Sequence, residues 1–249
     1  MPMPKYYGWG LPFDASTHGA QIDRLIIIIH IFMAILFFGW LIYLVMALIR
    51  FRQRPGHKAT YHLNHFKAPT YIEVAVALFE VALLVGFSFP IFNHYRNVPP
   101  SLDKAVQVRI VAEQFAWNVH YPGPDGLFGK TDPHWIGAGN PVGLDPNDPN
   151  GKDDITAINQ LHIPVHKPVV IRLSSKDVIH SFFLPVMRVK QDVIPGQVIP
   201  VWFEATQTGK FEIGCAQLCG LGHYRMRGLF AIESPEEFNQ WILEHSKPA

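Results

Sequence analysis

The chain has 249 residues, 49% of them hydrophobic, which is enough for one large domain or two small ones. Through Asn97 it carries eight basic and four acidic residues, whereas the remainder carries thirteen basic and sixteen acidic ones, for an overall formal charge of +1. A mildly acidic C-terminal part does not favour nucleic acid as a partner, and it favours a basic protein.

The first apolar segment predicts a transmembrane helix. The run from Leu25 to Ile49 has no charged residue and is long enough to cross a bilayer core of about 30 Å. A cleaved signal peptide is the alternative, but it needs a shorter apolar core followed by a small-residue cleavage site. The sequence RFRQRPGHK follows instead.

A second apolar segment, from Tyr71 to Phe92, predicts a second span that contains Glu73 and Glu80. The connection between the spans has no acidic residue and carries Arg50, Arg52, Arg54, Lys58 and Lys67. An excess of Lys and Arg is typical of cytoplasmic loops, so both termini are expected outside. Residues 1–97 are therefore interpreted as an N-terminal segment and a transmembrane hairpin, with spans at about 25–49 and 71–92.

Residues 98–249 are interpreted as an exported all-β domain. Val106, Val108 and Ile110 alternate with polar neighbours, and several more runs of this kind are separated by Gly and Pro, which predicts an antiparallel sandwich or small barrel. Residues 122–154 are rich in Gly, Pro, Asp and Asn and predict a long surface excursion between strands. Ser234, followed by acidic residues, predicts the cap of a short C-terminal helix.

The stretch IGCAQLCGLGHYRMRG contains both cysteines of the chain, Cys215 and Cys219, followed by His223 and Met226. A disulfide would suit an oxidising compartment, but so short a loop gains little stability from closure. Two buried inert thiols are another interpretation, but the surrounding glycines indicate a tightly bent loop rather than a packed core. A metal site is the interpretation that uses all four residues.

Thiolate and thioether are soft ligands and imidazole is borderline, a set that suits copper. A mononuclear blue-copper site needs one cysteine, so two cysteines suggest two copper ions bridged by two sulfurs. Another nitrogen ligand must come from elsewhere, and His180 is a candidate because strand ends distant in sequence meet at one pole of a sandwich. Ordinary packing is the alternative for His180 taken alone.

Two N-terminal spans, then DVIHSFFLPVMRVKQDVIPG, then CAQLCGLGHYRM, resemble subunit II of the haem-copper cytochrome c oxidases along nearly the whole chain. The resemblance implies a cupredoxin-like sandwich with a binuclear copper A centre, and it disfavours a zinc site. The implied copper ligands are the backbone carbonyl of Gln217 and the side chains of His180, Cys215, Cys219, His223 and Met226.

The sequence departs from the family pattern in informative places. Gln217 stands where most members have a glutamate that also reaches a magnesium ion at the contact with subunit I, so that magnesium site is in doubt. Phe115 and Trp117 stand where many members have a Trp-Tyr-Trp cluster at the point where electrons arrive. No Cys-x-x-Cys-His motif follows, so no fused cytochrome domain is expected.

By this resemblance, the chain takes electrons from cytochrome c or an equivalent donor and passes them to haem in subunit I, which reduces oxygen to water. The expected catalytic centre lies in that partner, and no catalytic residue is assigned in this chain. Trp117 and Phe115 are the candidates for electron transfer and are expected to share one strand face. Glu73 matches the family glutamate at the mouth of a proton path into subunit I. The alternative for Glu73 is an interfacial carboxylate that snorkels, and Glu80 has no assigned role.

The expected surroundings are a bacterial inner membrane with the copper domain in the periplasm or on the outer face. The expected partners are subunit I, other oxidase subunits, lipid and an electron donor, alone or within a supercomplex. The acids of the excursion predict a basic cytochrome c as donor, and they are Asp125, Asp132, Asp145, Asp148, Asp153 and Asp154.

The sequence bears on three other functions. Nitrous oxide reductase shares the copper A motif, but it is soluble and much larger, and quinol-oxidase subunit II lacks the copper ligands. A membrane-tethered copper carrier or sensor is the non-enzymatic alternative, but it is expected to release its metal.

Overall fold

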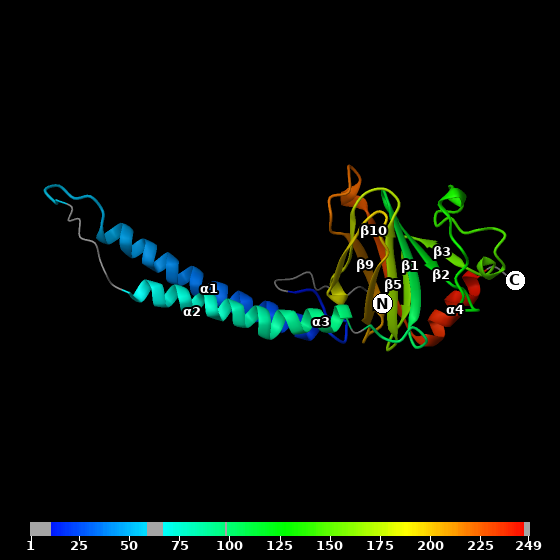
Figure 1. Ribbon diagram of the computed structural model, residues 1–249, viewed down its shortest axis with the longest axis horizontal. Coiled ribbons are helices and arrows are strands. Elements are labelled where there is room, and N and C mark those ends of the chain that lie inside the picture. The colour runs from blue at the N-terminus through cyan, green and yellow to red at the C-terminus, as the bar shows by residue number, and fades with distance from the viewer. Residues whose placement is uncertain (1–10, 59–66, 98, 247–249) are drawn as a thin grey trace. The chain divides into compact units, whose positions relative to one another are not determined.

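The computed structural model describes residues 11–58, 67–97 and 99–246. The first ten residues, the middle of the predicted cytoplasmic connection, residue 98 at the predicted domain boundary and the last three residues lie outside the described residues. The chain divides into two compact units. One comprises Gln21–His94, and the other combines the residues up to Ala20 with those from Tyr95 onward (Figure 1).

The first unit is helical. Helix α1 spans Gly19–Arg50, and the second apolar segment is formed by α2 (Ala68–Leu83), the π-helical turn η1 (Leu84–Ser88) and α3 (Phe89–Asn97). Gly19–Arg50 and Ala68–His94 are each long and apolar enough to cross a membrane. Glu73 and Glu80 both lie on α2 with exposed side chains. The two apolar helices of the predicted fold class are thus present.

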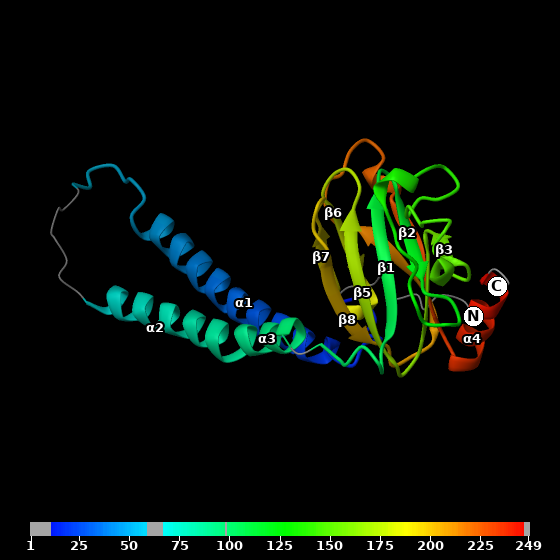
Figure 2. The ribbon, with the colours of Figure 1, turned by 45° about the vertical axis from the view of Figure 1, so that its right-hand side comes forward.

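The second unit is a sandwich of two five-stranded sheets (Figure 2). The first sheet has the order β3 (Ile155–Ile158), β2 (Ala116–Tyr121), β1 (Val106–Glu113), β5 (Pro168–Ser175) and β8 (Ile199–Glu204). The second has the order β4 (Gln160–Pro164), β10 (Arg227–Glu233), β9 (Gly209–Cys215), β6 (His180–Leu184) and β7 (Val189–Val193).

The predicted sandwich is confirmed, but the expectation of purely antiparallel sheets is wrong. Strand β1 pairs with β5 in parallel, and β10 pairs with β4 in parallel. The alternation along β1, where Val108, Ile110 and Ala112 are buried, fixes which face meets the core. This alternation does not indicate whether the neighbouring strand runs parallel or antiparallel.

The excursion between β2 and β3 is built on acidic side chains that accept backbone hydrogen bonds. It contains the short 3-10 turns η2 (Pro133–Trp135) and η3 (Pro149–Gly151). Asp132 accepts from the amide of His134, and Asp148 accepts from that of Lys130. Asp154 is 5% exposed and lies 2.6 Å from His120 Nε2. These carboxylates therefore hold turns, and Asp154 adds nothing to an exposed acidic surface.

Residues 12–17 pack on the sandwich as an N-terminal strap. The amide of Ala15 donates to the carbonyl of Val186 at 2.8 Å, and the carbonyl of Ala15 accepts from Thr206 at 2.8 Å. Arg188, at a φ of 54°, donates from its guanidinium to the carbonyls of Pro12, Phe13 and Pro185. The strap is therefore fastened before α1 begins.

Helix α4 (Pro235–His245) closes the domain toward the end opposite the loop between β9 and β10 (Figure 1). Ser234 and Glu237 form a reciprocal capping box at its first turn. Trp241 of α4 stacks on His162, with ring centroids 4.2 Å apart. The loop between β9 and β10 is thus left uncovered by the C-terminal helix.

Candidate metal centre

Strand pairing brings the candidate residues together at one pole of the sandwich. Phe182 of β6 lies opposite Cys215 at the end of β9, so His180 at the start of β6 comes beside that cysteine. Arg227 of β10 lies opposite Gly214 of β9, which closes the intervening residues into a hairpin loop. We call residues 215–226 the copper loop. Its last turn is the 3-10 turn η5 (His223–Arg225).

Sulfur and nitrogen atoms meet within this loop. The two cysteines are free thiols, and their sulfurs are 3.8 Å apart. The sulfur of Cys219 is 3.6 Å from Met226 Sδ and 3.6 Å from His223 Nδ1. The ligand atoms of His180, Cys215 and Cys219 all lie within 4.8 Å of one another. Five of the predicted ligands are therefore grouped around one point.

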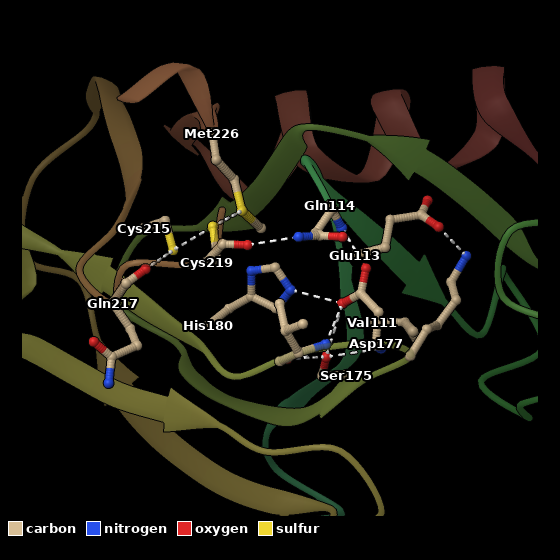
Figure 3. Close-up of polar contacts among 12 residues, drawn as sticks. Val111, Glu113, Gln114, Ser175, Asp177, His180, Cys215, Gln217, Cys219 and Met226 are labelled. Carbon is tan, nitrogen blue, oxygen red and sulfur yellow. Dashed lines mark hydrogen bonds and ion pairs between the residues drawn. The ribbon is translucent and has the colours of Figure 1, made fainter. Parts of the chain in front are cut away.

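The donor set fits a soft metal ion. A metal–sulfur bond is about 2.3 Å long, so two sulfurs 3.8 Å apart can both bind one ion or share two. His180 is fully buried, and its Nδ1 has no hydrogen-bond partner of normal geometry. Figure 3 shows this nitrogen on the side of the two sulfurs. A buried nitrogen with no partner is costly unless something binds it.

The backbone carbonyl of Gln217 faces the cluster, whereas its side chain does not. The carbonyl oxygen accepts from Cys215 Sγ at 3.2 Å. The exposed side chain turns away (Figure 3), and its Oε1 accepts from the amide of Leu218 at 3.1 Å. The carbonyl is thus in place beside the sulfurs without help from the side chain.

The local environment makes the two cysteines different. Burial would raise the pKa of Cys215, but His180 and the backbone at Ser181 and Gln217 outweigh it and lower the pKa to about 6. Burial and the neighbouring Cys215 raise the pKa of Cys219 to about 11. Cys215 is therefore the thiol that ionises first, which is the form in which a cysteine binds metal.

Asp177 orients His180, and the sequence reasoning did not find it. Its Oδ1 lies 2.9 Å from His180 Nε2, and its Oδ2 accepts from the amide of Gln114 at 2.7 Å. Burial would raise the pKa of Asp177, but these hydrogen bonds and one from Val178 outweigh it and lower the pKa. An ionised carboxylate can only accept, so Nε2 carries the proton and Nδ1 keeps its lone pair. The carboxylate three residues before His180 was the available signal.

Gln114 was also missed, because its partners are distant in sequence. Its side-chain Nε2 donates to the carbonyl of Cys219 at 2.7 Å, and its backbone amide donates to the carboxylate of Asp177. One residue in the turn between β1 and β2 therefore holds both the loop that carries the cysteines and the carboxylate that orients His180.

Phe115 and Trp117 both lie near the cluster, but they do not share a strand face. Phe115 lies in the turn between β1 and β2, where strand alternation does not apply. A Cβ on Gly222 would lie 2.4 Å from a ring carbon of Phe115, so the ring packs directly against the copper loop. Trp117 is fully buried, with its ring 6.1 Å from that of His180. A docking protein can therefore not touch Trp117.

Glu73 does not belong to this cluster. It lies on α2 in the helical unit with an exposed side chain, and it forms no hydrogen bond or ion pair with another described residue.

A two-span helical unit joined to a β-sandwich with a His, Cys and Met cluster at one pole defines a class: membrane proteins with a copper-binding, cupredoxin-like domain. Residues 148–232 match the family described as cytochrome c oxidase subunit II, periplasmic domain. The chain belongs to the cytochrome c oxidase subunit 2 family, whose members are parts of haem-copper terminal oxidases, which are oxidoreductases.

The chain is 32% identical over 235 residues to the alternative cytochrome c oxidase subunit 2 of Bradyrhizobium diazoefficiens, covering 94% of this chain and 83% of that protein. It is 26% identical over 254 residues to cytochrome c oxidase subunit 2 of Cereibacter sphaeroides, covering 96% and 80%. Among solved structures, it is similar to the periplasmic domain of subunit II of cytochrome oxidase of Bradyrhizobium japonicum. That match has 28% identity and a TM-score of 0.43, and it covers 59% of this chain and 95% of that one.

The contact between Phe115 and Gly222 gives a steric prediction. Gly222→Ala should lower the free energy of unfolding by about 1–3 kcal/mol, because the new Cβ overlaps the ring and the loop must shift. Denaturant unfolding of the purified chain measures this. Gly214→Ala is the matched control, since its Cβ would meet Phe183 at an ordinary 3.8 Å. Equal stability of the two variants would contradict the prediction.

Proposed function

We propose that this chain is the electron-accepting subunit of a terminal respiratory oxidase and that it carries a binuclear copper A centre. The observation that supports it most is the convergence of five soft or borderline donors at one pole, on the copper loop and on the start of β6. When bound, the copper pair would take one electron at a time from cytochrome c or an equivalent donor and yield it to haem in subunit I.

The proposed ligands are His180, Cys215, Cys219, His223, Met226 and the carbonyl of Gln217. Cys219 and Met226 are 4% and 2% exposed, so they would hold the ions away from water. Asp177 and Gln114 would keep the ligands in place before and after an electron arrives, since both bind parts of the site through hydrogen bonds of 2.7–2.9 Å. A cage that changes little on reduction suits electron transfer.

A copper carrier or sensor is the second candidate, and the burial of the site disfavours it. Release of the metal requires the copper loop to open, but Phe115 packs against it and Gln114 holds the carbonyl of Cys219. Membership of the oxidase subunit family also supports the electron-transfer role. The chain would lie in a bacterial inner membrane, with both termini and the copper domain on the outer face.

Copper content tests the proposed centre. Cys215→Ser or Cys219→Ser in the full chain should abolish binding of two copper ions and the paramagnetic resonance signal of a mixed-valence pair, because a hydroxyl is a harder and less acidic ligand. Ala216→Ser is the control, because it adds a hydroxyl to the same loop and removes no ligand. Binding of one zinc ion by the parent chain would contradict the proposal. Binding of two copper ions by the Cys219→Ser variant would contradict it as well.

A second prediction concerns the metal at the contact with subunit I. Gln217 offers no anionic oxygen, so the assembled oxidase should hold Mg²⁺ or Mn²⁺ weakly, and Gln217→Glu should strengthen it. The amount of manganese retained after dialysis against a chelator, measured by paramagnetic resonance, compares the parent oxidase with the Gln217→Glu variant. Equal retention by the parent and the variant would show that this side chain does not decide the affinity.

A third prediction concerns proton uptake through Glu73. An ionisable residue in a transmembrane span is costly and is therefore usually functional. We propose that Glu73 supplies protons to a path in subunit I, so Glu73→Gln should slow steady-state turnover of the assembled oxidase while copper content stays normal. Glu80→Gln is the control on the same helix. Unchanged turnover in Glu73→Gln would leave only the snorkelling interpretation.

A further inference from the structure

The copper loop carries the most exposed apolar side chains of the described outer domain. Leu221 is 98% exposed, Tyr224 is 85% exposed and Leu218 is 79% exposed. A nearly complete exposure of three large apolar side chains on one loop is unusual for a surface that faces only water. The loop is therefore expected to meet a partner.

The packing beneath the loop explains why Leu221 points outward. Gly220 and Gly222 lie on either side of it, and the ring of Phe115 fills the space against both glycines. Leu221 is also two residues from Cys219 and two from His223 in the chain. A protein that contacts Leu221 would therefore touch the loop next to two of the proposed ligands.

The charged side chains in and next to the copper loop are basic rather than acidic. Residues 214–227 contain Arg225 and Arg227 and no carboxylate. Arg225 lies over the ring of Phe115, 5.9 Å from its centroid, and forms no ion pair with any of the described residues. Arg227 lies 3.7 Å from Glu212.

Two of the nearby carboxylates on other elements have a basic partner, whereas Asp192 of β7, opposite Ser181, is exposed. Glu113 of β1 lies 2.5 Å from Lys176, and Asp177 lies 2.9 Å from His180. Arg225 is therefore the charge on the copper loop that is left to meet an incoming protein.

We propose that Leu221, Tyr224 and Arg225 form the docking surface for an electron-donor protein whose contact face is apolar and carries a carboxylate opposite Arg225. This rests on the proposed electron-accepting role. It replaces the expectation of a basic donor attracted by the excursion, whose acids hold turns. Apolar contact supplies the affinity, and the arginine selects the charge of the partner.

The test uses the assembled oxidase and two forms of one donor: basic mitochondrial-type cytochrome c, and the same cytochrome with its lysines converted to carboxylates by succinylation. The parent enzyme should have the lower KM for the succinylated form. Leu221→Ser should raise KM for both forms about tenfold, because a buried leucine contact is lost. Leu243→Ser, on exposed α4, is the matched control and should change neither KM.

Arg225→Glu should reverse the preference between the two cytochromes. Turnover driven by ascorbate with a small phenylenediamine mediator should be the same in all variants, since the mediator needs no docking surface. A lower KM of the parent for the unmodified cytochrome would overturn the proposal, as would an unchanged KM in Leu221→Ser. Loss of subunit I from the purified Leu221→Ser complex would also overturn it, because the surface would then belong to assembly. A parent whose copper the mediator cannot reduce would instead contradict the proposed function.

Discussion

The pairing of β6 with β9 is the constraint on which the rest of the site depends. Four of the candidate ligands lie within twelve residues of one hairpin loop, but His180 is 35 residues before Cys215 and reaches it only because Phe182 lies opposite that cysteine. A shift of one residue in this register would turn His180 to the other face of the sheet. Asp177 then fixes the ring, and Gln114 ties the same carboxylate to Cys219. Strand register and three hydrogen bonds thus set the positions of the candidate ligands. These positions matter because metal–ligand distances must be correct to within a few tenths of an ångström.

Much of the architecture could be predicted, because its signals are local. Uninterrupted apolar runs indicate the spans, alternation indicates buried strand faces, and the spacing of Cys215, Cys219, His223 and Met226 indicates soft-metal chemistry. What could not be predicted depends on long-range contacts. The parallel pairing of β1 with β5 joins residues about sixty positions apart, and the strap at residues 12–17 bonds to strands far along the chain. Gln114 carries no pattern that distinguishes it from any other polar turn residue.

The acidic residues of the excursion have a second explanation that composition alone does not reveal. Six aspartates on a Gly/Pro-rich segment look like a charged docking surface when only their number is considered. In the fold they accept backbone hydrogen bonds at turns, and Asp154 is buried beside His120. Aspartate is common in such turns because its short side chain reaches its own backbone two residues on. The fold requirement is therefore sufficient to explain these charges without a partner.

The distribution of burial around the copper loop meets the two requirements of the proposed electron-transfer site. Ions must be held in a dry, fixed cage, and a donor must nevertheless come close. Cys219, Met226 and His180 are buried, whereas Leu221, two residues from each of Cys219 and His223, is almost fully exposed. Phe115 contributes to the burial of the ligands and to the exposure of Leu221. Its ring packs against Gly220 and Gly222, so the side chain of Leu221 between them points to solvent. A copper carrier has the opposite need, because its metal must leave, and a loop fastened by Gln114 and Phe115 opposes that exchange. The same packing that excludes water from the ligands therefore favours the transfer of electrons over the transfer of ions.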